Sequence, residues 1–312
     1  MSLKCGIVGL PNVGKSTLFN ALTKAGIAAE NYPFCTIDPN VGIVEVPDTR
    51  LGVLSSIVKP ARVLPAVVEF TDIAGIIAGA SKGEGLGNKF LSHIRETAAI
   101  LLVARFFDHP DIIHVHGTVN PKHDLEVVLL ELILADLDTV TRAKDRYNKA
   151  LRAGGADAQV AMHYLEALEA ALSAEKLAST IPAATPVEQQ VKKELQLLTN
   201  KPVLVVANVS EDMLSTPPSR LFTEHNLASI VPSEDWVVPI CAKLEAELAG
   251  LEPEEQQEYL ATYGLTESGL NKLVLAAYKL LGLETYFTAG PQEVRAWTMP
   301  AGCKAPQAAG II

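Results

Sequence analysis

GLPNVGKS, residues 9–16, is the stretch around which the rest of the sequence is arranged. It matches the phosphate-binding pattern G-x-x-x-x-G-K-[ST], and its surroundings fit that pattern. An apolar run at residues 4–8 predicts a short buried strand before it, and residues 16–24 predict a helix after it. The glycines let successive backbone N–H groups converge on phosphate oxygens at the positive end of that helix. A glycine-rich turn with an exposed lysine is the alternative, but it leaves the flanking strand and helix unexplained.

The side chains of this P-loop have separate predicted roles. Lys15 is expected to reach the β- and γ-phosphates. Ser16 is expected to ligate Mg²⁺, an ion that prefers an octahedral oxygen shell shared with phosphate. The other nucleotide contacts expected from the loop are Asn12, Val13, Gly14 and Thr17.

Size and composition describe a globular protein with more than one structural unit. The 312 residues exceed one average domain, and a hydrophobic fraction of 48% is ample for a core. No apolar run approaches the roughly 18 residues of a membrane span, and no signal peptide precedes the first strand, so we expect a soluble cytoplasmic protein without a membrane partner. The net charge of −10 argues against a general nucleic-acid coat protein. Because no C-x-x-C pair is present, we expect the cysteines to be free thiols.

Two segments downstream of the P-loop predict the rest of a phosphate and Mg²⁺ site. Thr36 lies in NYPFCT, where Pro and Asn disfavour helix, and its hydroxyl suits a switch segment that touches Mg²⁺ and the γ-phosphate. Residues 67–72 predict a strand ending at Asp72, whose carboxylate can hold Mg²⁺ through water, and Gly75 can offer its N–H to the γ-phosphate. Each residue alone reads as an ordinary loop or turn residue. Their order, P-loop then Thr then D-x-x-G, is one that chance rarely supplies.

The group that positions the attacking water is missing from its usual place. Ile76 stands where Ras-type GTPases carry a glutamine that orients this water. Isoleucine cannot hydrogen-bond to water, so we expect either slow hydrolysis or a water held from elsewhere. The loop at residues 108–117 contains three histidines, of which His114 and His116 are candidate substitutes. A loop histidine is more often inert, and no fixed metal-ligand pattern accompanies these three.

Residues 124–200 have a different character. Apolar residues recur at helical spacing on both sides of Gly154 and Gly155, which predicts two long antiparallel helices with a glycine tip. A third helix is expected over residues 186–198. Such a helical arm, inserted into an α/β domain, is a suitable partner surface.

Basic side chains gather near the tip of this arm. Arg142, Arg146 and Lys149 share one predicted helix face. A solvated face explains these charges adequately. The alternative, which is more specific, is that these side chains contact RNA phosphates.

The sequence NVSE, residues 208–211, predicts the identity of the base. It follows a predicted strand at residues 203–207, where GTPases carry N-K-x-D, whose Asp accepts two hydrogen bonds from guanine. Val209 replaces the Lys and the longer Glu211 replaces the Asp, which compromises that recognition. The amide of Asn208 matches both N7 and the N6 amine of adenine. The sequence therefore favours ATP over GTP, with Asn208 and Glu211 as the expected base contacts and Val209 as a further nucleotide contact.

The remaining elements complete the nucleotide domain. A last strand is predicted at residues 236–241, and it places Cys241 and Ala242 where backbone N–H groups contact the base. Residues 268–281 predict a closing helix with an apolar face. Beyond it, a hairpin is expected in a stretch of roughly 30 residues that is too short to form a core of its own.

Taken together, these segments resemble the Obg-like ATPases of the YchF type, within the translation-factor class of P-loop NTPases. The resemblance runs from Lys4 to Ile312 and rests on GLPNVGKST, NYPFCTIDPN, DIAG, GASKGEGLGN, NVSE and TYFTAGPQEVRAWT. It implies an α/β fold: a P-loop G domain in two parts, an inserted α-helical coiled-coil domain and the start of a β-grasp-like TGS domain. The expected boundaries are 1–123, 124–200, 201–282 and 283–312. A complete TGS domain extends past Ile312, so only its opening part is expected here.

The resemblance also implies an activity. It implies Mg²⁺-dependent hydrolysis of ATP in preference to GTP, a hydrophobic residue in place of the catalytic Gln, and association with the ribosome, as the 50S subunit or the 70S particle. In that family a histidine on a flexible loop takes over catalysis, and this role falls on His114. We therefore predict a slow ATPase that acts as a ribosome-associated switch. The alternatives are a GTPase in ribosome assembly and a nucleotide-gated binding module whose turnover is incidental.

Asn12 carries a separate hypothesis. In some P-loop NTPases an Asn at this position coordinates K⁺, which supplies positive charge where an arginine finger otherwise would. A role in stabilising the loop is an alternative of equal weight.

Overall fold

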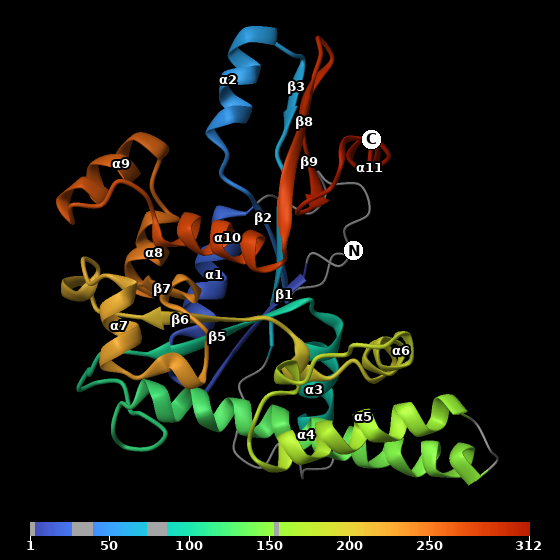
Figure 1. The fold of residues 1–312 in the computed structure, drawn as a ribbon. Helices are drawn as coiled ribbons and strands as arrows, with labels where there is room; N and C mark the ends of the chain where they lie inside the picture. The colour runs from blue at the N-terminus through green and yellow to red at the C-terminus, as the bar shows by residue number, and fades with distance from the viewer. Residues whose placement is uncertain (1–3, 27–39, 74–85, 153–155) are drawn as a thin grey trace.

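The structure, a computed structural model, describes residues 4–26, 40–73, 86–152 and 156–312. Its centre is a six-stranded sheet of order β2-β4-β1-β5-β6-β7, in which only β2 runs antiparallel to its neighbour (Figure 1). The strands are β1 (Lys4–Gly9), β2 (Val41–Glu45), β4 (Val67–Asp72), β5 (Ala99–Arg105), β6 (Val203–Asn208) and β7 (Val237–Ile240). β5 is buried along its whole length, as expected for a strand covered on both faces.

Helices cover both faces of this sheet. α1 (Lys15–Ala25) and α10 (Gly269–Leu280) lie on one side, and α3 (Leu86–Glu96) and the first half of α4 (Pro121–Arg152) lie on the other (Figure 1). The shorter helices of this half are α7 (Pro218–Glu224), α8 (Ala242–Leu248) and α9 (Pro253–Thr262). The predicted α/β fold class is confirmed. None of the described helices is long and apolar enough to cross a lipid bilayer.

Strand register brings the predicted site residues to one edge of the sheet. Gly9 at the end of β1 pairs with Val103 of β5, and Arg105 at the end of β5 pairs with Asn208 at the end of β6. Asp72 ends the neighbouring β4. In open α/β sheets, ligands bind at this carboxyl edge of the strands.

The helical arm is built on the second half of α4. α5 (Ala156–Ser173) and α6 (Pro186–Leu195) pack against it around a separate apolar core of Val140, Leu165, Leu168, Leu172 and Val191. The expected glycine tip lies outside the described residues. The third helix was expected to reach residue 198, but it ends at Leu195 because Gln196 adopts a left-handed conformation. The chain then forms a short 3-10 turn, η3 (Leu198–Asn200).

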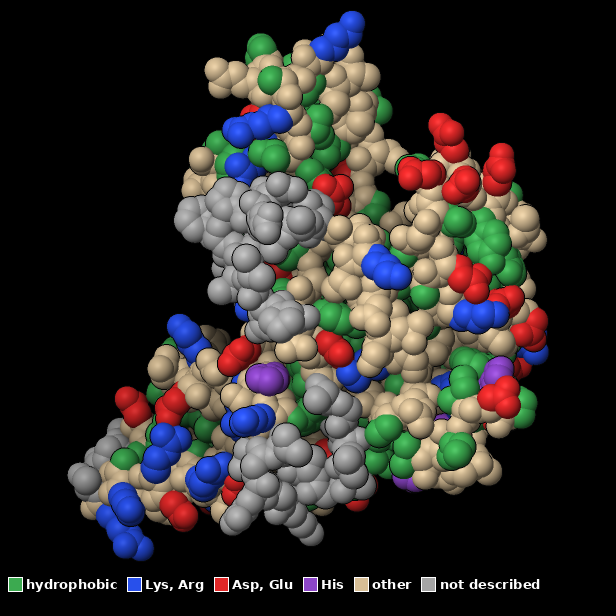
Figure 2. Space-filling model, turned by 180° about the vertical axis from the view of Figure 1, so that it is seen from behind, with side chains coloured by type: hydrophobic (Ala, Val, Ile, Leu, Met, Phe, Trp, Pro, Cys, Tyr) green, Lys and Arg blue, Asp and Glu red, His purple; other side chains and the backbone are tan. Residues whose placement is uncertain are grey.

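Figure 2 shows Lys, Arg, Asp and Glu side chains interspersed over this arm. Arg146 Nη1 lies 3.1 Å from Glu194 Oε1 on α6, and Lys144 pairs with Glu169 on α5. Arg142 pairs with Asp138 one turn earlier on α4. For Arg142 and Arg146, these acid partners fit a solvated helix face better than a surface reserved for phosphate.

A second sheet, of order β3-β9-β8, joins the end of the chain to an early segment. β8 (Leu283–Ala289) and β9 (Glu293–Pro300) form the predicted antiparallel hairpin. β3 (Arg62–Leu64) pairs with β9 in parallel, and α2 (Thr49–Val58) packs beside them (Figure 1). This pairing was not predicted. Val294 and Ala296 of β9 pack into the core of the nucleotide domain. A short helix, α11 (Ala305–Ala309), follows.

Candidate nucleotide-binding site

The P-loop connects β1 to α1, and its backbone explains the two glycines of the motif. Gly14 has a φ of 92°, and a Cβ on it would clash with the side-chain amide of Asn208. A Cβ on Gly9 would clash with the carbonyl oxygen of Val103 on β5. Asn12 also adopts a left-handed conformation, with a φ of 62°. Glycine is therefore required by the strained turn at Gly14 and by the close approach of β5 at Gly9.

Lys15 and Asp72 meet at the carboxyl edge of the sheet. The ammonium of Lys15 forms an ion pair with Asp72 Oδ1, and Lys15 is only 8% exposed. Ser16 and Thr17 are exposed in the first turn of α1, where backbone N–H groups and the helix dipole favour an anion. The structure thus brings together the predicted phosphate-binding lysine, hydroxyl and carboxylate.

The donor set suits Mg²⁺ held together with phosphate. Ser16 and Asp72 offer hard oxygen ligands, and within the described ranges no cluster of three His, Cys, Asp or Glu forms an all-protein metal site. Mg²⁺ in nucleotide sites usually takes one or two protein oxygens and completes its shell with phosphate and water. The predicted ligand Thr36, the predicted phosphate contact Gly75 and its neighbour Ile76 all lie outside the described residues.

Asn208 joins the P-loop to the loop after β7. Its Nδ2 donates to the carbonyl oxygen of Val13 at 2.8 Å, and its Oδ1 accepts the N–H of Ala242 at 3.1 Å. The side chain is buried in this bridge. A primary amide has two N–H groups and two lone pairs, so one of each remains after these bonds. This matches the acceptor and the donor that adenine offers.

Two predicted contacts have side chains that face the interior. Val209 is 1% exposed and Cys241 is 3% exposed, and both pack in apolar clusters. Burial raises the pKa of the Cys241 thiol, so it stays protonated. The backbone N–H of Val209 donates to Ile240. Any direct contact from these two residues to a nucleotide would have to come from the remaining backbone groups.

Glu211 is held by two partners that the sequence did not identify. Lys243 Nζ lies 2.9 Å from Oε1, and the hydroxyl of Tyr263 donates to Oε2 at 3.2 Å. The bond from Lys243 is the main reason that the pKa of the Glu211 carboxyl is lowered. The carboxylate therefore stays ionised, and its two oxygens are directed toward Lys243 and Tyr263.

His114 is drawn inward instead of being open to solvent. The residue is 5% exposed, and its Nε2 lies 2.8 Å from Asp124 Oδ2. Its Nδ1 accepts the N–H of His116 at 3.2 Å. Because Nδ1 accepts, the neutral ring carries its proton on Nε2 and donates it to Asp124. Both ring nitrogens are thus occupied.

The loop that carries His114 is nevertheless tied to the P-loop. Asn12 Nδ2 donates to the carbonyl oxygen of Ile113 at 3.2 Å, and Arg105 Nη1 donates to that of Ile112 at 3.1 Å. His114 therefore lies on a segment bonded to the phosphate site, while its ring bonds to α4. Sequence reasoning missed Asp124, although an acid among the apolar positions of an amphipathic helix is a signal that can be searched for.

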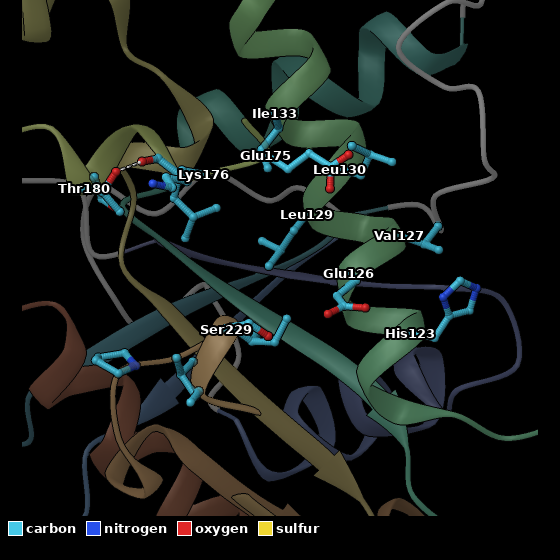
Figure 3. A pocket seen from close by; sticks show the side chains of 16 residues that line it. His123, Glu126, Val127, Leu129, Leu130, Ile133, Glu175, Lys176, Thr180 and Ser229 are labelled. Atoms are coloured by element: carbon cyan, nitrogen blue, oxygen red, sulfur yellow. Dashed lines mark hydrogen bonds between the residues drawn. The ribbon is translucent and has the colours of Figure 1, made fainter. Parts of the chain in front are cut away.

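A cavity of about 770 Å³ lies away from this site. Figure 3 shows Leu129, Leu130 and Ile133 of α4 on one wall and Lys176 and Thr180 on another, with Ser229 beneath. His123 stands at one end. Its lining is mostly apolar, and it brings together none of the residues predicted to bind nucleotide.

Comparison with family models matches both ends of the chain. Residues 4–133 match the family described as 50S ribosome-binding GTPase. Residues 283–312 match the family described as a protein of unknown function, DUF933. The first match covers the P-loop, Asp72 and His114, and the second begins at β8.

Individual proteins match over nearly the whole chain. The sequence is 54% identical to the Ribosome-binding ATPase YchF of Bacillus subtilis over 316 residues, covering 100% of this chain and 85% of that protein. It is 52% identical to the protein of the same name from Shigella flexneri over 312 residues, with the same coverage. The solved structure of the Schizosaccharomyces pombe YchF GTPase superposes with a TM-score of 0.84 at 37% identity, covering 99% of this chain and 84% of that one.

Proposed function

Because this chain belongs to the YchF family, we propose that it is a Mg²⁺-dependent nucleoside triphosphatase that prefers ATP and acts as a ribosome-associated switch. The observation that carries the proposal is the convergence of Lys15, Asp72 and Asn208 at one edge of the sheet. The relatives named Ribosome-binding ATPase support the substrate and the partner.

The phosphate end of the site would be served by three side chains. Lys15 would exchange its carboxylate partner for the β- and γ-phosphates, which releases Asp72 to face the metal. Ser16 and Asp72 would hold Mg²⁺, with Thr36 as a further ligand from the switch segment. Bound Mg²⁺ neutralises charge that develops on the phosphate oxygens.

Adenine recognition would rest on Asn208. Its bonds to Val13 and Ala242 already orient the amide, so no side-chain entropy is lost on binding the base. The amide then offers one N–H to N7 and one lone pair to the N6 amine. A second candidate, a GTPase, is favoured by the name of the fission-yeast relative, YchF GTPase, and by the matching family of ribosome-binding GTPases.

Water positioning is assigned to His114, and it requires a local rearrangement. As long as Asp124 and the His116 N–H occupy both ring nitrogens, the imidazole has no atom available for water. His114 must leave Asp124 before it can act, which suits an enzyme that turns over slowly. A nucleotide-gated binding module with incidental turnover is the alternative.

Asn12 is the proposed determinant of K⁺ dependence. Its Nδ2 is bonded to Ile113, so Oδ1 is the atom that a cation would take. We expect faster hydrolysis in K⁺ than in Na⁺ at equal ionic strength. Equal rates in the two salts would contradict the proposal and leave Asn12 as a tether of the His114 loop.

Three measurements test the proposal. Dissociation constants for ATP and GTP should show tighter binding of ATP, and tighter binding of GTP would support the second candidate. Turnover of His114→Ala should fall, whereas unchanged turnover would support the binding module. Co-sedimentation with 70S ribosomes should depend on the bound nucleotide, and the absence of binding in every nucleotide state would remove the ribosome from the proposal.

A further inference from the structure

Glu211 occupies the position from which a carboxylate reads guanine in N-K-x-D proteins, but here both of its oxygens already have donors. Lys243 Nζ lies 2.9 Å from Oε1, and the Tyr263 hydroxyl lies 3.2 Å from Oε2. We name these two bonds the Glu211 clasp. Neither donor is part of a nucleotide, so the clasp is a property of the protein alone.

Three separate elements build the clasp. Glu211 opens the 3-10 turn η4 (Glu211–Met213) directly after β6, and Lys243 lies in the first turn of α8. Tyr263 is the residue that caps the carboxyl end of α9. An apolar cluster that includes Leu244, Leu248 and Leu260 holds α9 against α8, which fixes Tyr263 beside Glu211.

Packing and charge both support the clasp. The ring of Tyr263 meets that of Tyr259 edge to face, with centroids 5.6 Å apart, so its direction is constrained. The bond between Lys243 and Glu211 lowers the pKa of the carboxyl and raises that of the ammonium. Both groups therefore remain ionised, and the ammonium offsets the negative charge of the carboxylate.

The clasp has opposite consequences for the two purines. An ionised carboxylate only accepts hydrogen bonds, so it attracts the N1–H and N2 amine of guanine. Adenine presents a lone pair at N1 instead, and a free carboxylate at that edge would repel it. Because Lys243 and Tyr263 direct the carboxylate and the ammonium offsets its charge, the clasp weakens both the attraction for guanine and the repulsion of adenine.

We infer that Lys243 and Tyr263 determine nucleobase specificity by holding Glu211 away from the base. The inference rests on the proposed ATP preference, which then has two causes. Asn208 binds adenine, and the clasp keeps the Glu211 carboxylate, which would favour guanine, from the base. α9 then serves as the support of a specificity-determining contact.

The test compares binding of the non-hydrolysable analogues AMPPNP and GMPPNP, with Mg²⁺, by calorimetry on the full chain. In the double variant Lys243→Ala/Tyr263→Phe, Glu211 is free to turn toward the base. We expect the ratio of the GMPPNP to the AMPPNP dissociation constant to fall by about tenfold, since sites that hydrogen-bond a base group discriminate strongly for it. Lys243→Arg keeps the charge and the donors and should retain the ratio of the unmodified protein.

Controls separate the clasp from general effects. Lys279→Ala removes another exposed lysine of the nucleotide domain, one that lies over Trp236 and not beside Glu211, so its ratio should not change. Thermal unfolding of each variant reports folding independently of the ratio. If the unmodified protein binds AMPPNP more tightly but the double variant keeps the same ratio, the clasp is overturned alone. If the unmodified protein binds GMPPNP more tightly, the proposed ATP preference itself fails.

Discussion

Releasing His114 from Asp124 is expected to accelerate hydrolysis. The bond joins His114 Nε2 to Asp124 Oδ2 at 2.8 Å, and both side chains are 2% exposed. A hydrogen bond to a charged group contributes about 1.5–3 kcal/mol. Removing it with Asp124→Ala therefore shifts the equilibrium toward released His114 by roughly 10- to 150-fold, at about 1.4 kcal/mol for each factor of ten.

Steady-state ATP hydrolysis at saturating Mg²⁺ measures this effect. We expect kcat to rise in Asp124→Ala, by up to the full shift if release limits the rate, while KM stays nearly constant. Asp124→Asn keeps an acceptor without the charge, so its kcat should lie between that of the unmodified protein and that of Asp124→Ala. The double variant Asp124→Ala/His114→Ala should be as slow as His114→Ala alone, because the gain acts only through the imidazole.

The opposite result has a definite meaning. If Asp124→Ala lowers kcat as far as His114→Ala does, Asp124 orients the histidine for catalysis, as the Asp of a catalytic triad does. The reasoning from occupied ring nitrogens would then be wrong. Thermal unfolding of Asp124→Ala separates this outcome from simple loss of fold.

Three further predictions concern stability and the metal. Asp136→Ala should lower the free energy of unfolding by about 2–4 kcal/mol, because the N–H groups of Leu198 and Thr199 lose their buried acceptor. The exposed Asp138→Ala on the same helix should change it by less than about 0.5 kcal/mol, and urea unfolding of both variants checks the difference. Burial raises the pKa of the Glu245 carboxyl, so the folded protein binds this proton more tightly and loses stability as pH rises above the ordinary carboxyl pKa. Glu245→Gln should lessen that loss, and an equal pH dependence in both proteins would contradict it. Chelation with EDTA should stop hydrolysis, and undiminished turnover in EDTA would argue against a required metal.

The parts of the fold that the sequence predicted are those with strong local patterns. β5 is an unbroken apolar run, and the P-loop glycines lie where backbone geometry and a close neighbour require them. β3 has no such pattern, because only three residues form it and two of them are exposed. Its pairing with β9 joins segments from opposite ends of the chain, which no local periodicity encodes.

In the candidate site, too, residues in local motifs could be predicted from the sequence, and residues whose roles depend on long-range contacts could not. Lys15, Asp72 and Asn208 were predicted because motif spacing reports the carboxyl ends of strands. Asp124 and Tyr263 were missed because their roles depend on what folding places beside them. A histidine can be named as a candidate from its loop, but the direction of its ring depends on a carboxylate in another element.

Two buried acids on α4 differ in how many of their carboxylate oxygens are hydrogen-bonded. This difference predicts which part of the helix is held firmly. Asp136 is fully buried, and its two oxygens accept the N–H groups of Leu198 and Thr199 and the hydroxyl of Thr199. Asp124, about three turns earlier, bonds His114 through Oδ2, but its buried Oδ1 has no partner within the described part of the chain. A fully bonded acid rigidifies its surroundings, whereas an unpaired buried oxygen carries an uncompensated desolvation cost. The fold therefore fixes α4 at the base of the arm and leaves its contact with His114 the easier one to open.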